Sequence, residues 1–145
     1  MENSQQSPPN EPAPNLAFLK VLCVLTFIGS GLGFISYGGI GLLFDFITQN
    51  LSLIPDEQNR DLVELTLSAG RLFFYLNTLL YGFSFTGALY LWKLKKTGFH
   101  LYTLSQLLLL ILPLAFIKGY PMPGLTIFLT ILFVLGYGGY LKYMK

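Results

Sequence analysis

Four stretches of the chain contain no acidic residue and are long enough to cross a lipid bilayer. A transmembrane helix needs about 20 predominantly apolar residues to span some 30 Å of hydrocarbon. The predicted spans cover residues 16–38, 72–92, 99–117 and 125–141. Charged residues make up 11% of the chain, against roughly 25% in soluble domains. Residues 16–145 are therefore expected to fold as an all-α integral membrane protein, a four-helix up-and-down bundle.

Residues 1–15 differ in composition from everything that follows. They hold four of the eight prolines and have almost nothing apolar to bury, which predicts a disordered tail. They carry no basic residue and no small-residue cleavage site. A cleavable signal peptide needs both features, so the first span is expected to remain as an anchor.

The connection between the second and third spans is the most basic part of the chain. Lys93, Lys95 and Lys96 lie there within four residues, and short connections rich in lysine and arginine stay in the cytoplasm. Alternation of the spans then places both termini, and with them the tail at residues 1–15, on the cytoplasmic side. The predicted orientation is N-in/C-in.

The longest connection, Asp45 to Arg71, is expected on the outer side. Residues 55–69 are typical of a short amphipathic helix, with Pro55 at its first position and acidic residues near its start. One face would carry Leu62, Leu65 and Ala69. Gly70 is expected to act as a hinge before the second span. The segment would serve either as a partner-docking or gating element or as a solvated extension of the second span.

Small residues recur at helical spacing in the first two spans. Membrane helices approach closely through such residues, because the hydrophobic effect adds little between helices in lipid. The candidate packing residues are Thr26, Gly29, Gly33 and Ser36 in the first span and Thr78, Gly82 and Thr86 in the second. We expect these spans to pack together, and homodimerisation through the first span is the competing use. The glycine-rich stretch Tyr37-Gly38-Gly39-Ile40-Gly41 predicts a kink, an end or a re-entrant stretch.

Ion-coupled transport needs an ionisable group at membrane depth. Each charged residue near a span, such as Lys20 or Arg71, lies where it can reach an interface. This argues against a proton-coupled antiporter. Uncharged polar residues do occur within the predicted spans, namely Asn77, Thr103 and Gln106. They indicate either a site for a small polar substrate or hydrogen bonds between helices, which contribute about 0.6 kcal/mol on average.

Residues that carry catalysis or bind metals are scarce. One histidine, His100, and one cysteine, Cys23, cannot supply the three or four ligands of a metal site. No serine or cysteine nucleophile has an evident base, and a net charge of +2 is too small to indicate nucleic-acid binding. We expect no enzymatic activity, no cofactor and no nucleic-acid partner.

The string Trp92-Lys93-Leu94-Lys95-Lys96-Thr97-Gly98-Phe99-His100-Leu101-Tyr102 combines an interfacial tryptophan, a lysine cluster, a glycine that would reverse the chain, and aromatic residues that re-enter the membrane. It resembles the corresponding turn in uncharacterised small four-span inner-membrane proteins of bacteria, particularly Bacteroidetes-like ones. The resemblance implies a bacterial inner-membrane location and no activity that can be assigned to a residue.

These features favour a small multi-pass membrane protein that acts by association with the lipid bilayer, with a membrane-protein partner or with further copies of itself. The alternative is a small uncoupled transporter or channel with a polar path near Gln106, Asn77 and Thr103.

Overall fold

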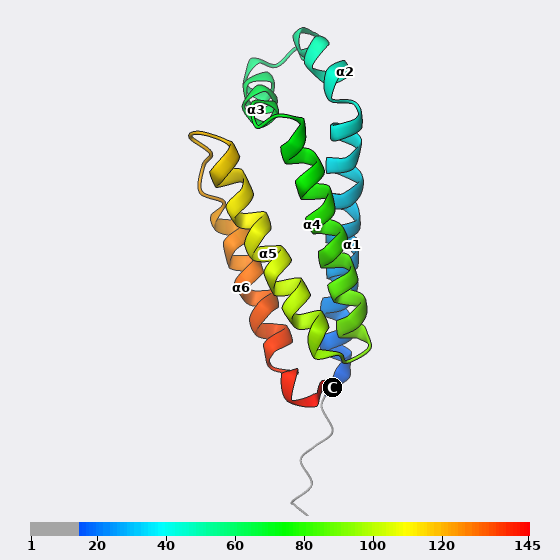
Figure 1. Cartoon of the computed structure of the whole chain (residues 1–145). Coiled ribbons are helices and arrows are strands. Elements are labelled where there is room, and N and C mark those ends of the chain that lie inside the picture. Colours follow the sequence, from blue (N-terminus) through cyan, green and yellow to red (C-terminus); the bar gives the residue numbers. More distant parts are fainter. Residues whose placement is uncertain (1–14) are drawn as a thin grey trace, which may run out of the picture.

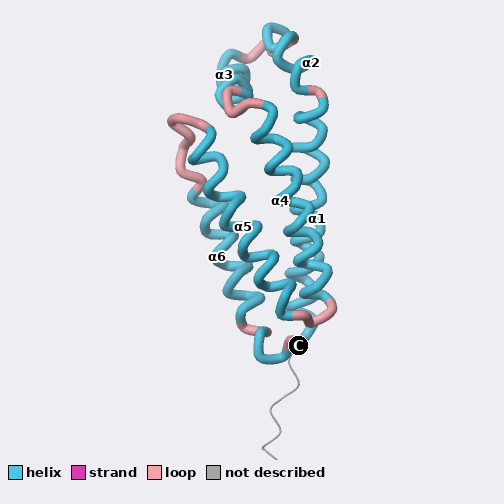
Figure 2. Tube along the Cα trace, in the orientation of Figure 1, coloured by secondary structure: helices cyan, strands magenta, loops and turns pink. Residues whose placement is uncertain are grey.

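The computed structural model describes residues 15–145, and within this range the chain is helical with no strand (Figure 2). The predicted tail lies almost wholly outside the described residues. The helices are α1 (Leu16–Leu42), α2 (Phe44–Gln49), η1 (Leu51–Leu53), α3 (Glu57–Leu67), α4 (Arg71–Trp92), α5 (Lys96–Phe116), α6 (Gly124–Gly138) and η2 (Leu141–Tyr143). Within the described range, four segments are long and apolar enough to cross a membrane: α1, α4, α5 and residues Gly124–Tyr143. The structure thus confirms the all-α class and the four apolar helices.

The four long helices run alternately up and down (Figure 1). Helix α4 packs closely along both α1 and α5, whereas α6 makes fewer close approaches to α5 and α1. In Figure 1 the α1–α4 pair and the α5–α6 pair converge near the α4–α5 turn and diverge toward α3 and the α5–α6 connection. The bundle is consequently held most tightly at one end.

Helix α1 continues through the glycine-rich stretch that was expected to end or kink it. The helix runs for 27 residues, about 40 Å at 1.5 Å per residue. The helix therefore extends four residues beyond the predicted end of the span at residue 38. The glycines instead leave room for side chains of α4. A Cβ at Gly38 would lie 3.4 Å from Thr78, and a Cβ at Gly41 would lie 3.1 Å from Tyr75. Close packing of α1 on α4 accounts for these two glycines.

The connection between α1 and α4 contains α2, η1 and α3. Asp56 is the N-cap of α3, and its carboxylate accepts a hydrogen bond from the Gln58 amide at 3.1 Å. Pro55 therefore precedes the cap and does not occupy the first helical position as predicted. Gly70 adopts a φ of 81°, a conformation open to glycine, and separates α3 from α4. Arg71 forms an ion pair with Asp45, which ties the start of α4 to α2.

Side chains of α3 fold back onto a cluster that includes Phe73 and Phe74 of α4. Leu67 is buried, and Leu65 and Ala69 are partly buried against this cluster. Leu62, expected on the same face, is exposed. The apolar contact of α3 with the bundle is thus centred nearer its C-terminal end than the sequence indicated.

The chain reverses between α4 and α5 at Leu94, which has a φ of 56°. The Lys95 amide donates to the Tyr90 carbonyl and the Leu94 amide to the Leu91 carbonyl, both at 2.9 Å. This is the Schellman arrangement that closes a helix end through a left-handed residue. Gly98 lies inside α5, so the expectation that this glycine reverses the chain is wrong.

Gly98 instead allows a close approach between the backbones of α4 and α5. A Cβ at Gly98 would lie 2.6 Å from the Leu91 nitrogen and 2.7 Å from the Gly87 carbonyl oxygen. A Cβ at Gly87 would lie 2.8 Å from the Tyr102 nitrogen. The backbones of α4 and α5 are therefore in direct contact just above the lysine turn.

Candidate functional site

Two of the three predicted packing residues of the second span, Thr78 and Gly82, lie against α1. The methyl group of Thr78 faces Gly38, and Gly82 would place a Cβ 3.5 Å from the Phe34 ring. Thr86 donates to the Gly82 carbonyl at 2.9 Å within its own helix. On α1, a Cβ at Gly33 would lie 2.5 Å from Tyr81. These contacts position α1 and α4 as a closely packed pair.

The other candidates of the first span do not share that face. Thr26 is buried and bonds to α6, since its hydroxyl lies 2.7 Å from that of Tyr137. Gly29 and Ser36 are exposed, and a Cβ at Gly29 would meet nothing within 4 Å. The expectation that all four small residues form one packing face is wrong, because Gly29 and Ser36 are exposed and do not pack against α4.

A network of hydroxyl and amide groups joins three helices at the level of Gly29. The hydroxyls of Ser30 on α1 and Ser84 on α4 lie 2.9 Å apart. Gln106 on α5 donates from Nε2 to the Ser84 Oγ at 2.9 Å. We call Ser30, Ser84 and Gln106 the hydroxyl–amide network. The sequence singled out Gln106 but not this pairing, because no periodicity links serines 54 positions apart.

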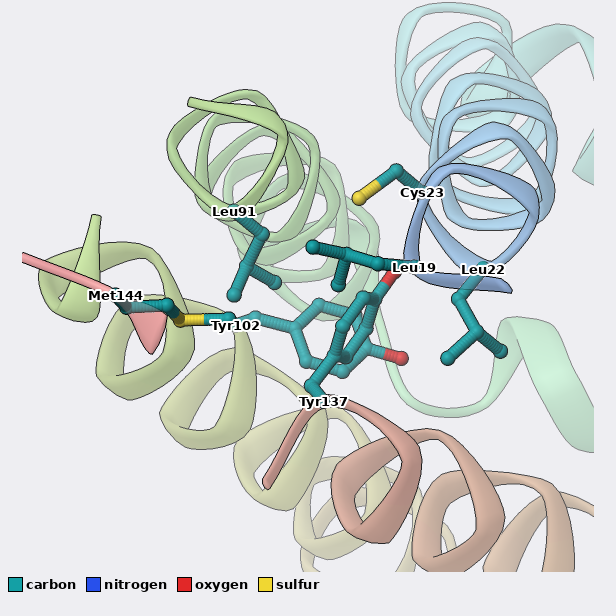
Figure 3. Packing of buried hydrophobic residues seen from close by; sticks show 7 residues of the cluster. All are labelled: Leu19, Leu22, Cys23, Leu91, Tyr102, Tyr137 and Met144. Carbon is teal, nitrogen blue, oxygen red and sulfur yellow. The ribbon is translucent and has the colours of Figure 1, made fainter. Parts of the chain in front are cut away.

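Below this network, two tyrosines fill the interior (Figure 3). Tyr137 of α6 is fully buried, and its ring meets that of Tyr102 edge-on with centroids 5.0 Å apart. Apolar residues of the same cluster surround them: Leu19, Leu22, Cys23, Leu91 and Met144. Neither tyrosine was predicted to be a core residue. Tyr102 belongs to the aromatic residues expected to re-enter the membrane after the lysine cluster, and no pattern in the sequence distinguishes Tyr137. Together they close the lower end of the interior.

Above the tyrosines lies a cavity of about 260 Å³, here called the central cavity. All four long helices contribute to its lining. The lining residues with hydroxyl or amide groups are Thr26, Ser30, Tyr81, Tyr102, Gln106, Thr126 and Thr130, and the others are Leu25, Gly29, Leu129 and Phe133.

The central cavity opens sideways between α1 and α6. Four of its lining residues are exposed: Leu25 and Gly29 on α1, and Thr126 and Leu129 on α6. We call this opening the α1–α6 seam. Because α6 approaches α1 closely at few points, protein atoms do not close the seam at the level of the cavity.

A second cavity of about 110 Å³, the upper cavity, lies toward the α5–α6 connection. It shares Tyr81, Gln106 and Thr126 with the central cavity. Asn77 also lines it, so the structure brings together two of the three predicted intramembrane polar residues. The remaining one, Thr103, lines neither cavity, and its buried hydroxyl has no hydrogen-bond partner among the described residues. The polar path predicted through all three residues is therefore not assembled.

The linings of both cavities offer hydrogen bonds without charge. No Asp, Glu, Lys or Arg of the described chain lines either one, and residues 15–145 hold no group of three or more His, Cys, Asp and Glu side chains placed to bind a metal ion. Pro113 lacks the N–H that would otherwise bond the carbonyl of Leu109 one turn earlier. The carbonyl oxygen of Leu109 is therefore an additional hydrogen-bond acceptor. The site can thus bind uncharged hydrogen-bonding groups.

The chain matches no protein-family model, no curated protein and no solved structure.

Proposed function

We propose that this protein is a small, non-enzymatic multi-pass protein of a bacterial inner membrane that acts by association with another membrane component. That component is a lipid of the bilayer, a membrane-protein partner or a second copy of the chain. The observation that supports this proposal is the open α1–α6 seam.

Polar groups at the seam explain why an uncovered seam is unfavourable. An unsatisfied polar group in hydrocarbon costs several kcal/mol, because no water is available to bond it. Thr126 is exposed at the opening, and the half-buried Gln106 lines the cavity behind it. A component that fills or covers the seam satisfies these groups, so association stabilises the bundle.

The proposed orientation is N-in/C-in. Its support is the lysine cluster of the α4–α5 turn, which carries Lys93, Lys95 and Lys96, because lysine-rich short connections stay in the cytoplasm. In this orientation α2, η1 and α3 lie outside the cytoplasm. The resemblance of the turn to those of small bacterial inner-membrane proteins supports the location.

Site-specific photo-crosslinking in native membranes tests the association. A benzophenone amino acid replaces Leu25, which is exposed on α1 at the α1–α6 seam, and in a matched control it replaces Gly31 of the same helix, which does not line the central cavity. Neither position is buried. We expect a discrete adduct of one lipid or protein species from Leu25 and not from Gly31. Equal adducts from both positions, or none from Leu25, would overturn the proposal.

The second candidate function is uncoupled passage of a small uncharged solute. It is favoured by one observation, that Gln106 and Asn77 line the same cavity and that this cavity shares residues with the central one. Vesicles containing the purified protein should then swell faster in glycerol than empty vesicles. Gln106→Leu should abolish the difference. An unchanged rate in Gln106→Leu vesicles would eliminate this candidate.

A further inference from the structure

We infer that the central cavity is a binding site for an uncharged amphipathic molecule of the bilayer, with its hydrogen-bonding head between the helices and its hydrocarbon tail leaving through the α1–α6 seam. The inference rests on the proposed association and specifies the component as a neutral lipid.

The absence of charge in the lining determines the charge of the head. A charged group buried in a low-dielectric interior without a counter-charge carries a large desolvation cost. No charged residue of the described range lines the cavity. An anionic phospholipid head would meet no basic side chain there, whereas a hydroxyl or ester carbonyl would meet partners of its own kind.

The hydroxyl–amide network prepares the cavity for such a head. One N–H of Gln106 is held by Ser84, which fixes the plane of the amide. An amide has a second N–H and a carbonyl oxygen with two lone pairs. Gln106 can therefore both donate a hydrogen bond to a ligand and accept one from it while keeping its hydrogen bond to Ser84.

The volume of the cavity limits how much of the molecule enters. The cavity has a volume of about 260 Å³ and is open on one side. That space holds a glycerol unit with its ester groups, and a partner's helix is far too large for it. Tyr102 and Tyr137 close the lower end, so the rest of the molecule must leave sideways.

The seam provides an apolar exit for the tail. Leu25, Leu129 and Phe133 line the cavity beside Gly29, which has no side chain. The space next to Gly29 is open, because a Cβ there would meet no atom within 4 Å. This glycine therefore keeps the mouth of the cavity clear.

The test uses a photoactivatable probe in vesicles that contain the full-length protein. The probe is a diacylglycerol with a diazirine near the head end of one acyl chain, and the comparison is a phosphatidylglycerol with the same chains. We expect the diacylglycerol to label peptides of α1 and α6 that line the seam, about tenfold more than the phosphatidylglycerol, a ratio equivalent to about 1.4 kcal/mol. Equal labelling by the two lipids would overturn the inference.

Gly29→Leu places a side chain at the mouth, where a Cβ would meet no atom within 4 Å, and it should reduce labelling by the diacylglycerol about tenfold, equivalent to about 1.4 kcal/mol. The matched control is Gly39→Leu, since Gly39 also has no atom within 4 Å of its Cβ position and lines none of the cavities described above. Unchanged labelling of folded Gly29→Leu protein would contradict the inference. If Gly29→Leu does not fold, Thr126→Leu fills the mouth from α6 and carries the same expectation.

The outcomes separate this inference from the proposed association. A protein adduct from Leu25 together with equal labelling by both lipids would leave the association standing and remove the neutral lipid. Failure of the Leu25 adduct together with selective diacylglycerol labelling would leave a cavity that binds the lipid in vesicles, and the proposed association in native membranes would fall.

Discussion

The hydroxyl of Ser30 lies 2.9 Å from that of Ser84 in the middle of the bundle. Both serines are almost completely buried, at 3% and 0% exposed. Gln106 extends the contact to α5, so one small side chain, Ser84, links three membrane helices. Two of the three residues, Ser30 and Gln106, line the central cavity, which makes the network both a packing element and part of the candidate binding site.

Ser84→Ala should lower the free energy of unfolding by about 1 kcal/mol, because it removes two interhelical hydrogen bonds of about 0.6 kcal/mol each. The double variant with Ser30→Ala should cost less than the sum of the two single changes, since both remove one shared bond. Unfolding in mixed micelles with increasing denaturing detergent measures all three variants. Strict additivity would show that the two hydroxyls do not interact.

Gly98→Ala should destabilise the bundle by about 1–3 kcal/mol, the usual cost of forcing extra atoms into a packed interior. The added methyl group would meet backbone atoms of Leu91 and Gly87, which cannot rotate aside. Gly31→Ala is the matched control, because a Cβ at Gly31 meets nothing within 4 Å. Equal stability of the two variants would contradict the backbone contact between α4 and α5.

Tyr137 should contribute more through packing than through its hydrogen bond. Tyr137→Phe removes the bond to Thr26, and we expect a loss of about 0.6 kcal/mol. Tyr137→Ala removes the buried ring as well, and we expect about 3–5 kcal/mol, the range for large aromatic residues. The same detergent unfolding measures both. A loss from Tyr137→Phe as large as that from Tyr137→Ala would show that the hydrogen bond dominates.

Single-cysteine labelling tests the proposed orientation. Cys23 is the one cysteine of the chain and is fully buried, so Cys23→Ala provides the background. A membrane-impermeant maleimide, added to cells whose outer membrane has been permeabilised, should label Asn59→Cys in α3. It should label Thr97→Cys, at the start of α5 beside the lysine cluster, only after the inner membrane is opened. The reverse pattern would invert the orientation of the whole bundle.

The spans could be predicted because membrane insertion depends on a local property. A run of about 20 apolar residues without acids is visible in one sequence window. The predicted second span, residues 72–92, differs from α4 by one residue at its start. Capping was harder to predict: Asp56 and Leu94 end or start helices through hydrogen bonds that depend on the folded turn.

The site was only partly predictable because it depends on how helices rotate about their axes. The helical spacing is consistent with a single packing face that contains Thr26, Gly29, Gly33 and Ser36. In the structure Gly33 packs against α4 and Thr26 bonds to α6, whereas the other two residues are exposed. Gln106 was recognisable as a polar residue within a span. Ser84 could not be recognised as its hydrogen-bond partner, because a serine in a membrane helix usually bonds its own backbone.

Native mass spectrometry of the protein released from its own membranes tests the central claim, association at the α1–α6 seam, most directly. We expect the wild-type chain to retain one additional bound species and Gly29→Leu to lose it, with Gly39→Leu behaving as wild type. A wild-type protein that is folded and carries nothing, with the same mass spectrum as Gly29→Leu, would contradict the account.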